Sequence, residues 1–175
     1  YASIAHERHD DLFGGSRNAP VSNVNNAAVT SRDKATQVSF VYTLDKKHSF
    51  GLDVIRKEYK ENPTAVGAFK SYSNTAYMLS MENRWGGPWR TAAHYVRADD
   101  GSCSLVGTTC TTDGLEGSKF VIAGAYYFSK RTYAFGAVNH ISNGKSARYS
   151  SVDVGDAPNA GEDITQVAFG LSHNF

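Results

Sequence analysis

The feature of this 175-residue chain that most constrains its fold is a series of segments in which apolar and polar residues alternate. Alternation with a period of two is typical of a β-strand that has one apolar face. The strands expected from this pattern are each about 8 to 13 residues long. They lie at residues 1–9, 34–44, 49–59, 73–84, 88–98, 118–128, 132–143 and 163–175. The sequence therefore predicts an antiparallel, all-β protein.

The connections between these segments are short and long in turn. The short ones lie at residues 45–48, 85–87 and 129–131. The long ones are rich in Gly, Asn and Ser and lie at residues 10–33, 60–72, 99–117 and 144–162. Soluble domains rarely carry so many long loops at one end of a meander. Transmembrane β-barrels do so regularly, with short turns on one side of the membrane and long loops on the other, so we expect a transmembrane antiparallel β-barrel.

Each segment combines an apolar face with a face of small or polar residues. In residues 34–44, for example, the apolar positions are Val38, Phe40, Tyr42 and Leu44. A strand of about ten residues tilted by about 45° rises roughly 23 Å, which is close to the apolar thickness of an outer membrane. A soluble β-sandwich, the alternative, would need charged residues on its outward face, and the second face here is mostly Ala, Gly, Ser and Thr. Residues 55–59 also fit a helical period, and only their place between a short turn and a long loop favours a strand.

Aromatic residues gather at the short-turn ends of the segments. The set comprises Phe50, Trp85, Trp89, Tyr126, Phe128, Tyr133 and Phe175. Aromatic rings with one apolar and one hydrated side are favoured at membrane interfaces, so we expect these residues to form an interfacial belt.

Composition excludes several classes of protein. With 18 Lys+Arg against 17 Asp+Glu the chain lacks the basic surplus of a nucleic-acid-binding protein, so no nucleic-acid partner is expected. The mean hydropathy of -0.41 argues against a bundle of membrane helices. The chain has no initiating Met, from which we expect a processed or partial chain. Cys103 and Cys110 lie close together in a polar stretch, which favours a disulfide-closed loop over two free thiols.

Motifs for catalysis or cofactors are weak. Residues 31–34 and 142–145 both match Ser-x-x-Lys, but the partner motifs of the β-lactamase fold are absent. His6 and His9 lie on opposite faces of a strand and do not form a metal site. We therefore expect no enzyme activity, no cofactor and no metal.

Acidic residues in two long loops offer a possible site for divalent cations that bridge lipopolysaccharide, although solvated acidic loops are the simpler interpretation. These residues are Asp99, Asp100, Asp113, Glu116, Asp153, Asp156, Glu162 and Asp163.

Several stretches resemble the general porins of Gram-negative bacteria, in particular the neisserial and β-proteobacterial type. Residues 126–133 read Tyr-Tyr-Phe-Ser-Lys-Arg-Thr-Tyr, similar to the penultimate short hairpin of that family. Residues 169–175 read Phe-Gly-Leu-Ser-His-Asn-Phe, similar to the C-terminal signature of outer-membrane barrels. Residues 84–90 and the loop from Cys103 to Cys110 are similar to features of some β-proteobacterial members.

The resemblance implies that residues 1–175 are the C-terminal half of one sixteen-stranded porin barrel, without the N-terminal half that carries the constriction loop. It also implies a homotrimer in the bacterial outer membrane, with surrounding lipid and lipopolysaccharide as partners. The barrel-assembly machinery would recognise the C-terminal strand during insertion. The residues of that C-terminal assembly signal are Val167, Phe169, Leu171, His173 and Phe175.

Charged residues on the second face of the strands are candidates for lining a water-filled lumen, because a charge facing lipid costs about 2–4 kcal/mol at mid-membrane. By parity these are Asp53, Lys57, Glu82, Arg84, Arg90 and His94. The alternative for each is a charge near a strand end, at the level of the lipid headgroups.

The expected function is passive diffusion of ions and small hydrophilic solutes through an outer-membrane channel. One alternative is a closed eight-stranded barrel that acts as a membrane anchor or adhesin. Such a barrel is filled by its own side chains, whereas the many small residues here favour a wide lumen. A soluble β-sandwich binding module is the third possibility.

Overall fold

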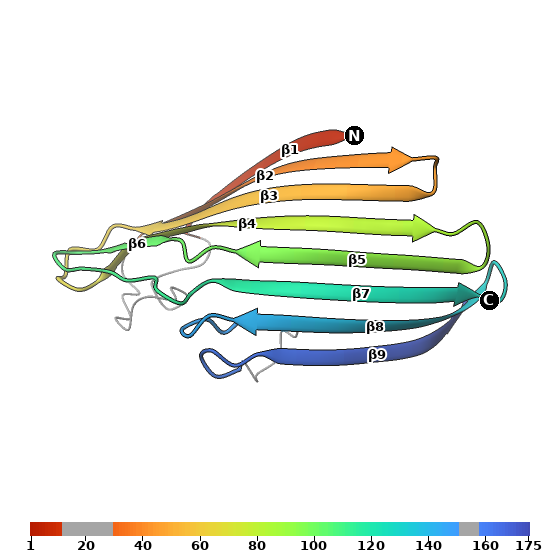
Figure 1. Ribbon diagram of the computed structural model, residues 1–175. Coiled ribbons are helices and arrows are strands. Elements are labelled where there is room, and N and C mark those ends of the chain that lie inside the picture. Colours follow the sequence, from red (N-terminus) through yellow and green to blue (C-terminus); the bar gives the residue numbers. More distant parts are fainter. Residues whose placement is uncertain (12–29, 151–157) are drawn as a thin grey trace.

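The computed structural model describes residues 1–11, 30–150 and 158–175, which form one antiparallel sheet (Figure 1). Its strands are β1 (Ala2–Asp10), β2 (Ser31–Leu44), β3 (His48–Glu61), β4 (Phe69–Arg84), β5 (Trp89–Ala98), β6 (Ser102–Leu105), β7 (Gly117–Tyr127), β8 (Thr132–Asn143) and β9 (Ile164–His173). No helix within the described ranges is long and apolar enough to cross a membrane.

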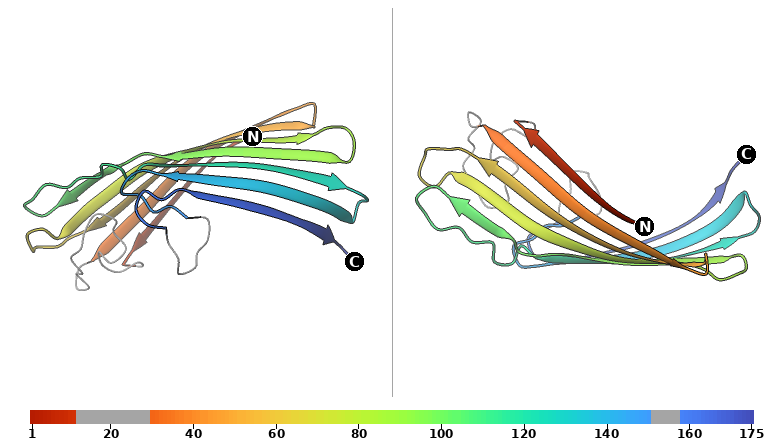
Figure 2. Two further views of the ribbon diagram at one scale, coloured as in Figure 1. Left: turned by 60° about the horizontal axis from the view of Figure 1, so that its bottom comes forward. Right: turned by 90° about the horizontal axis from the view of Figure 1, so that it is seen from above.

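The eight long strands follow one another in chain order, β1-β2-β3-β4-β5-β7-β8-β9, and the short β6 pairs with the beginning of β4. The sheet is strongly twisted and curved (Figure 2). Short turns lie at one end and long connections at the other, and both chain ends lie on the side of the short turns (Figure 1). Strands β1 and β9 are the two edges, and the described residues contain no pairing between them. The predicted antiparallel, all-β meander is therefore confirmed, and the described strands form an open sheet rather than a closed barrel.

The register explains how one face of the sheet becomes apolar. Directly paired residues of antiparallel strands point to the same side of the sheet. One such row crosses the sheet as Leu52, Leu79, Tyr95, Phe120 and His140. The adjacent row on the same face contains Met81, Ala93, Ile122, Val138 and Val167. We call this side the apolar face and the other side the polar face.

The side chains of the apolar face are not buried by any other layer. Leu79 is 57% exposed and Phe169 is 87% exposed, whereas the buried hydrophobic residues, such as Phe69, lie near the long connections. A soluble sandwich would cover such a face, because contiguous exposed apolar surface of this extent marks an interaction site. The fold therefore leaves a wide apolar surface without a protein partner among the described residues.

One expected strand boundary is wrong, and two further details of the strands and turns emerge from the structure. The expected strand start at residue 73 lies earlier, at Phe69, because the start of β4 pairs with β6, a strand that the alternation did not indicate. Residues 55–59 are extended as far as Glu61, since β2 and β4 pair with β3 on both sides. The tight β2–β3 turn has Asp45 and Lys46 with positive φ, the conformation of a type I′ hairpin turn.

Candidate functional site

The polar face of the sheet carries all of the charged residues that the sequence placed there. Asp53, Lys57, Glu82, Arg84, Arg90 and His94 alternate with residues of the apolar face along β3, β4 and β5. They form no single cluster. Lys57 lies toward the long connections, Asp53 and His94 near the middle, and Glu82, Arg84 and Arg90 toward the short turns. The charges are thus spread along the strand direction.

The middle of the polar face is held by short polar contacts. The Oδ1 atom of Asp53 accepts hydrogen bonds from Ser39 Oγ at 2.5 Å and from Gln37 Nε2 at 3.0 Å. At the other side of the sheet Asn139 Nδ2 donates to Gln166 Oε1 at 2.8 Å. These hydrogen bonds hold polar side chains of neighbouring strands in place against the sheet.

Several polar-face residues were absent from the sequence-based candidates. They are Gln37, Lys119, Asn139 and Gln166. Parity along the strands contains the signal for them, because each stands one position away from an apolar-face residue such as Val38 or Phe120. Gln37, Asn139 and Gln166 are neutral amides, whereas Lys119 is a cation with the same parity as the expected residues.

The aromatic residues at the short turns divide between the two faces. Trp89 and Tyr126 are direct partners on the apolar face, with ring centroids 4.9 Å apart, and Tyr126 contacts Phe128 at 5.1 Å. Tyr133 was expected in the same belt, but this is wrong. It pairs with Tyr127 on the polar face, where the two rings stack at 4.9 Å.

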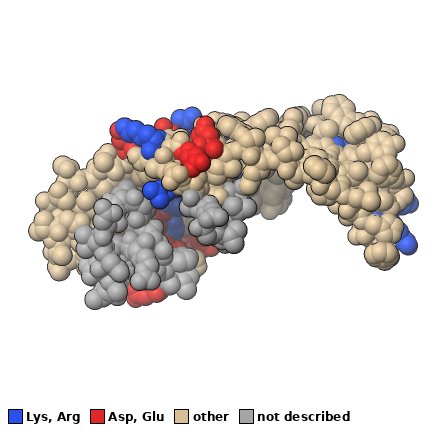
Figure 3. Space-filling view, turned by 90° about the horizontal axis from the view of Figure 1, so that it is seen from below, with Lys and Arg blue, Asp and Glu red and all other residues tan. Residues whose placement is uncertain are grey.

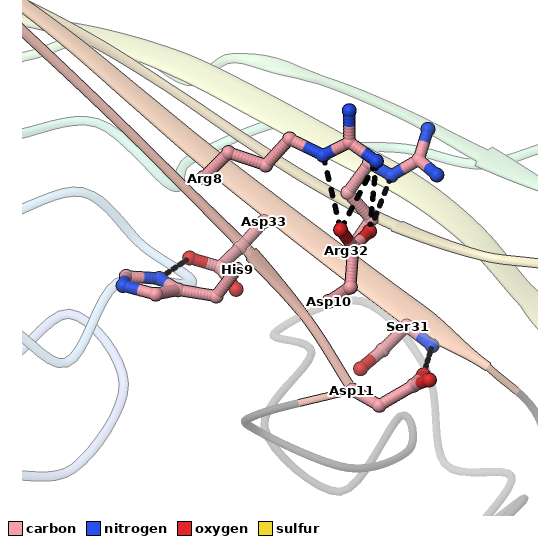
Figure 4. A network of polar contacts seen from close by, with 7 residues as sticks. All are labelled: Arg8, His9, Asp10, Asp11, Ser31, Arg32 and Asp33. Carbon is pink, nitrogen blue, oxygen red and sulfur yellow. Dashed lines mark hydrogen bonds and ion pairs between the residues drawn. The ribbon is translucent and has the colours of Figure 1, made fainter.

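A network of charges lies at the long-connection end of β1 and β2 (Figure 4). On the side of the apolar face, the Asp10 carboxylate accepts hydrogen bonds from Arg8 Nε at 3.1 Å and Arg32 Nε at 2.7 Å. On the polar side, His9 Nδ1 lies 2.7 Å from Asp33 Oδ2. At this end of β1 and β2 charged side chains therefore replace apolar ones on the apolar side. Figure 3 shows, from the side of β9, that charged side chains gather over one part of the molecule beside a long stretch that is mostly uncharged.

The two histidines of β1 lie as parity predicts. His6 Nδ1 contacts Thr36 Oγ1 at 2.8 Å on the side of the apolar face, and His9 contacts Asp33 on the other side. Across the described ranges, no group of three or more His, Cys, Asp or Glu side chains is placed to hold a metal ion.

The connection after β8 folds against the connection before β7 through Tyr149. The Tyr149 backbone N–H donates to Asn143 Oδ1 at 2.7 Å, and its hydroxyl donates to the Leu115 carbonyl at 3.2 Å. The ring covers Gly117, where an added Cβ would lie only 2.4 Å from Tyr149 Cδ2. Burial raises the pKa of Tyr149, and the nearby carboxylates of Asp99 and Asp100 raise it further. The absence of a side chain at Gly117 therefore leaves the room in which the Tyr149 ring packs.

Beside Tyr149, a hollow of about 970 Å³ lies between the loop and the part of the polar face near the long connections. Its charged lining includes Glu7, Asp33 and Lys57 from the strands and Lys145 and Arg148 from the loop. Lys145 is paired with Asp113, and this hydrogen bond raises the pKa of the Lys145 ammonium group. The loop thus adds two cations to the polar side of the molecule.

Replacing Gly117 with Ala is expected to loosen this loop, because the new methyl group must displace the Tyr149 ring. Such overpacking destabilises the closed loop by about 1 kcal/mol or more. The population of molecules with an open loop should then rise at least about fivefold. Tryptic cleavage after Lys145 and Arg148 of the folded protein should accelerate by that factor. Gly124→Ala on the same strand is the control, since its Cβ would meet only the Arg90 carbonyl at 3.9 Å. Equal cleavage rates in the two variants would contradict the role of Gly117.

Three of the loop carboxylates accept backbone hydrogen bonds within the protein, whereas the buried Oε2 atom of Glu116 has no hydrogen-bond partner among the described residues. Asp99 accepts from the Thr75 N–H at 2.9 Å, Asp100 from the Glu116 N–H at 2.9 Å, and Asp163 from the Asn143 N–H at 2.8 Å. These bonds attach the long connections to strand ends, which is a structural role. Asp153 and Asp156 lie outside the described residues.

Cys103 and Cys110 form a disulfide, with Cα atoms 5.8 Å apart. Cys103 belongs to β6 and pairs with Tyr72 of β4. The disulfide therefore closes a loop within the connection after β5, and the pairing of β6 attaches this connection to the beginning of β4.

The C-terminal residues present one apolar row. Val167, Phe169, Leu171 and His173 share the apolar face of β9, and Phe175 follows beyond the end of the strand. The ring of Phe175 contacts that of His173, with centroids 4.9 Å apart. Because β9 is an edge strand, its outer hydrogen-bonding groups have no partner strand in the described sheet.

Comparisons with known proteins find similarity in structure. No protein-family model matches the chain, and no curated protein matches it in sequence. Among solved structures, an anion-selective porin from Comamonas acidovorans superposes with a TM-score of 0.72 at 15% sequence identity. The match covers 99% of this chain and 45% of that porin, so the chain spans less than half the length of its structural neighbour. The sheet therefore has a porin-like fold.

Proposed function

We propose that this chain is part of the wall of an outer-membrane porin, a channel for passive diffusion of ions and small hydrophilic solutes. The observation that carries the proposal is the exposed apolar face, backed across the same strands by small and polar side chains. A sheet of this kind is stable when lipid covers one side and water the other. The porin-like fold supports the same conclusion.

The open sheet favours a wide barrel over the closed eight-stranded alternative. Its edges β1 and β9 remain apart, and the central polar face carries a row of alanines at residues 92, 123, 137 and 168. An eight-stranded barrel would be filled by its own inward side chains. We infer that the described strands form the C-terminal half of a sixteen-stranded barrel in the bacterial outer membrane, and that edge pairing with further strands closes it.

Within that barrel the polar face is the lumen wall. Asp53, Lys57, Glu82, Arg84, Arg90 and His94 would then contact water and passing solutes, because all six share this face. Because these residues are spread along the strand direction, a solute that moves along the wall would meet charges of both signs in turn and not one cluster. Transport by such a wall needs no catalytic group or cofactor.

The assembly partners belong to the same proposal. Three copies would form a trimer surrounded by lipid and lipopolysaccharide, with the ionic side chains beyond the apolar band, such as Arg32, at headgroup level. The C-terminal row on β9 would be the segment that barrel-assembly machinery binds during insertion. Unpaired strand edges of this kind accept an added strand.

The complete gene product should require detergent for extraction from outer membranes and should form ohmic, water-filled channels in planar lipid bilayers. The reason is that the apolar face is unstable in water while the polar face is hydrated. Stepwise conductance increments and β-sheet circular dichroism in detergent are the measurements. A folded protein that stays soluble without detergent would contradict membrane residence, and folded protein that inserts without conductance would contradict the channel.

A further inference from the structure

We propose that the short-turn end of the polar face contains a binding site for aromatic carboxylates, formed by Arg84 and Arg90 together with Tyr127, Tyr133 and Phe135. This inference deepens the proposed channel function and rests on it for access of solutes to this face. The site lies apart from the long connections and from the hollow beside Tyr149.

The two arginines form a pair of cations in which only Arg84 has an ion-pair partner among the described residues. Arg84 and Arg90 are direct cross-strand partners, a position in which like charges destabilise an antiparallel sheet. Glu82 offers one carboxylate, 3.4 Å from Arg84 Nε. Among the described residues, no carboxylate lies within ion-pair distance of Arg90. A bound anion would relieve this repulsion.

Arg90 is oriented by an aromatic ring instead of a carboxylate. Its Cζ atom lies 4.3 Å from the centroid of the Tyr127 ring, a cation–π contact. Tyr127 in turn stacks on Tyr133, with ring planes 25° apart. Because the ring holds the guanidinium group without occupying its hydrogen-bond donors, those donors remain available to a carboxylate.

Phe135 supplies an exposed aromatic surface on this face. Its ring is 40% exposed, 6.2 Å from Tyr133, and it lies over Gly170 of β9. An added Cβ at Gly170 would approach the ring within 2.7 Å, so the absence of a side chain there makes room for it. A phenyl ring exposed beside small and polar residues is suited to contact an aromatic solute.

The spacing between the cations and the rings suits one planar ligand. In the register Ala125 lies between Arg90 and Phe135, so a methyl group forms the floor. Two strand spacings separate Arg90 from Phe135, roughly 10 Å between their backbones. The proposed ligand is a benzoate-sized molecule with its carboxylate at the guanidinium groups and its ring beside Phe135. Aliphatic carboxylates would lose the ring contact, and neutral aromatic molecules would lose the charged hydrogen bonds.

The test measures the binding of 4-fluorobenzoate to the folded, complete gene product in detergent, with fluorine NMR as the readout. Arg90→Gln should weaken binding by about tenfold, the factor expected on removal of a charged hydrogen-bond donor. The matched control is Lys130→Gln, which removes one cation from the short turn at the same end and should leave the affinity within about twofold. Phe135→Leu should reduce the preference for 4-fluorobenzoate over acetate by about threefold.

Folding of each variant is checked by heat-modifiable gel mobility, and Arg90→Lys serves if Arg90→Gln does not fold, because it keeps the charge without the bidentate geometry. Equal affinities for Arg90→Gln and Lys130→Gln, or equal binding of 4-fluorobenzoate and acetate, would overturn the site. Planar-bilayer recordings separate the two proposals. Binding with this pattern in a protein that forms no channels would refute the porin function alone, and channels without this pattern would refute the site alone.

Discussion

Ile122→Arg is expected to abolish most of the folded, membrane-inserted protein. Ile122 lies at the centre of β7, is 50% exposed, and shares the apolar face with Ala93 and Val138. If lipid covers this face, an arginine at mid-membrane costs about 2–4 kcal/mol, a large part of the stability of a typical domain. The measurement is the fraction of protein with heat-modifiable gel mobility in isolated membranes.

The control for this prediction is the next residue along the chain. Ala123 points to the polar face, where its cross-strand partners are Ala92 and Ala137, so an arginine there has room and water. Ala123→Arg should therefore insert at close to the normal level and change only the ionic selectivity of the channel. Equal losses in the two variants would show that the strand tolerates neither arginine, and would remove the distinction between lipid and water faces on which the proposed function depends.

The long strands were predictable because one physical requirement acts on every one of them. An apolar face without a covering layer needs an apolar residue at every second position, so the period of two extends over nearly the whole strand. The turn residues were equally clear, since Asp45 and Lys46 occupy a short polar break between two alternating segments. The same requirement placed Asp53 and Arg90 on the polar face by counting alone.

Contacts beyond the apolar band did not follow from the sequence. The segment that begins β4 pairs with β6, where neither strand has an alternating pattern. The contact of Tyr149 with Gly117 joins two loops, and nothing in the local sequence of either predicts it. The position of Tyr133 was mistaken for a different reason. An aromatic residue at a strand end is typical of a membrane interface, which is why Tyr133 was assigned to the belt. Tyr133 lies two residues before Phe135 on the same strand, so it points to the same polar face.

Removal of Phe175 is expected to reduce the amount of assembled protein while leaving the channel properties of the assembled molecules nearly unchanged. The apolar row of β9 ends at this residue, and its ring contacts His173 on the apolar side. β9 is also an edge of the described sheet, and in the proposed barrel it would have to pair with another strand, because unpaired backbone groups in hydrocarbon cost several kcal/mol each.

The deletion therefore separates assembly from conduction. Phe175 lies beyond the end of β9 and far from the polar-face charges such as Asp53, so single-channel conductance of inserted molecules should stay within the spread of the unaltered protein. Asn174→Ala is the control, since Asn174 precedes Phe175 without belonging to the apolar row. Folded protein in membranes should fall several-fold for the Phe175 deletion and stay normal for the control. Normal membrane levels of the deletion would remove Phe175 from the assembly signal, whereas a fall in both variants would assign the effect to the length or integrity of the terminus rather than to the aromatic ring.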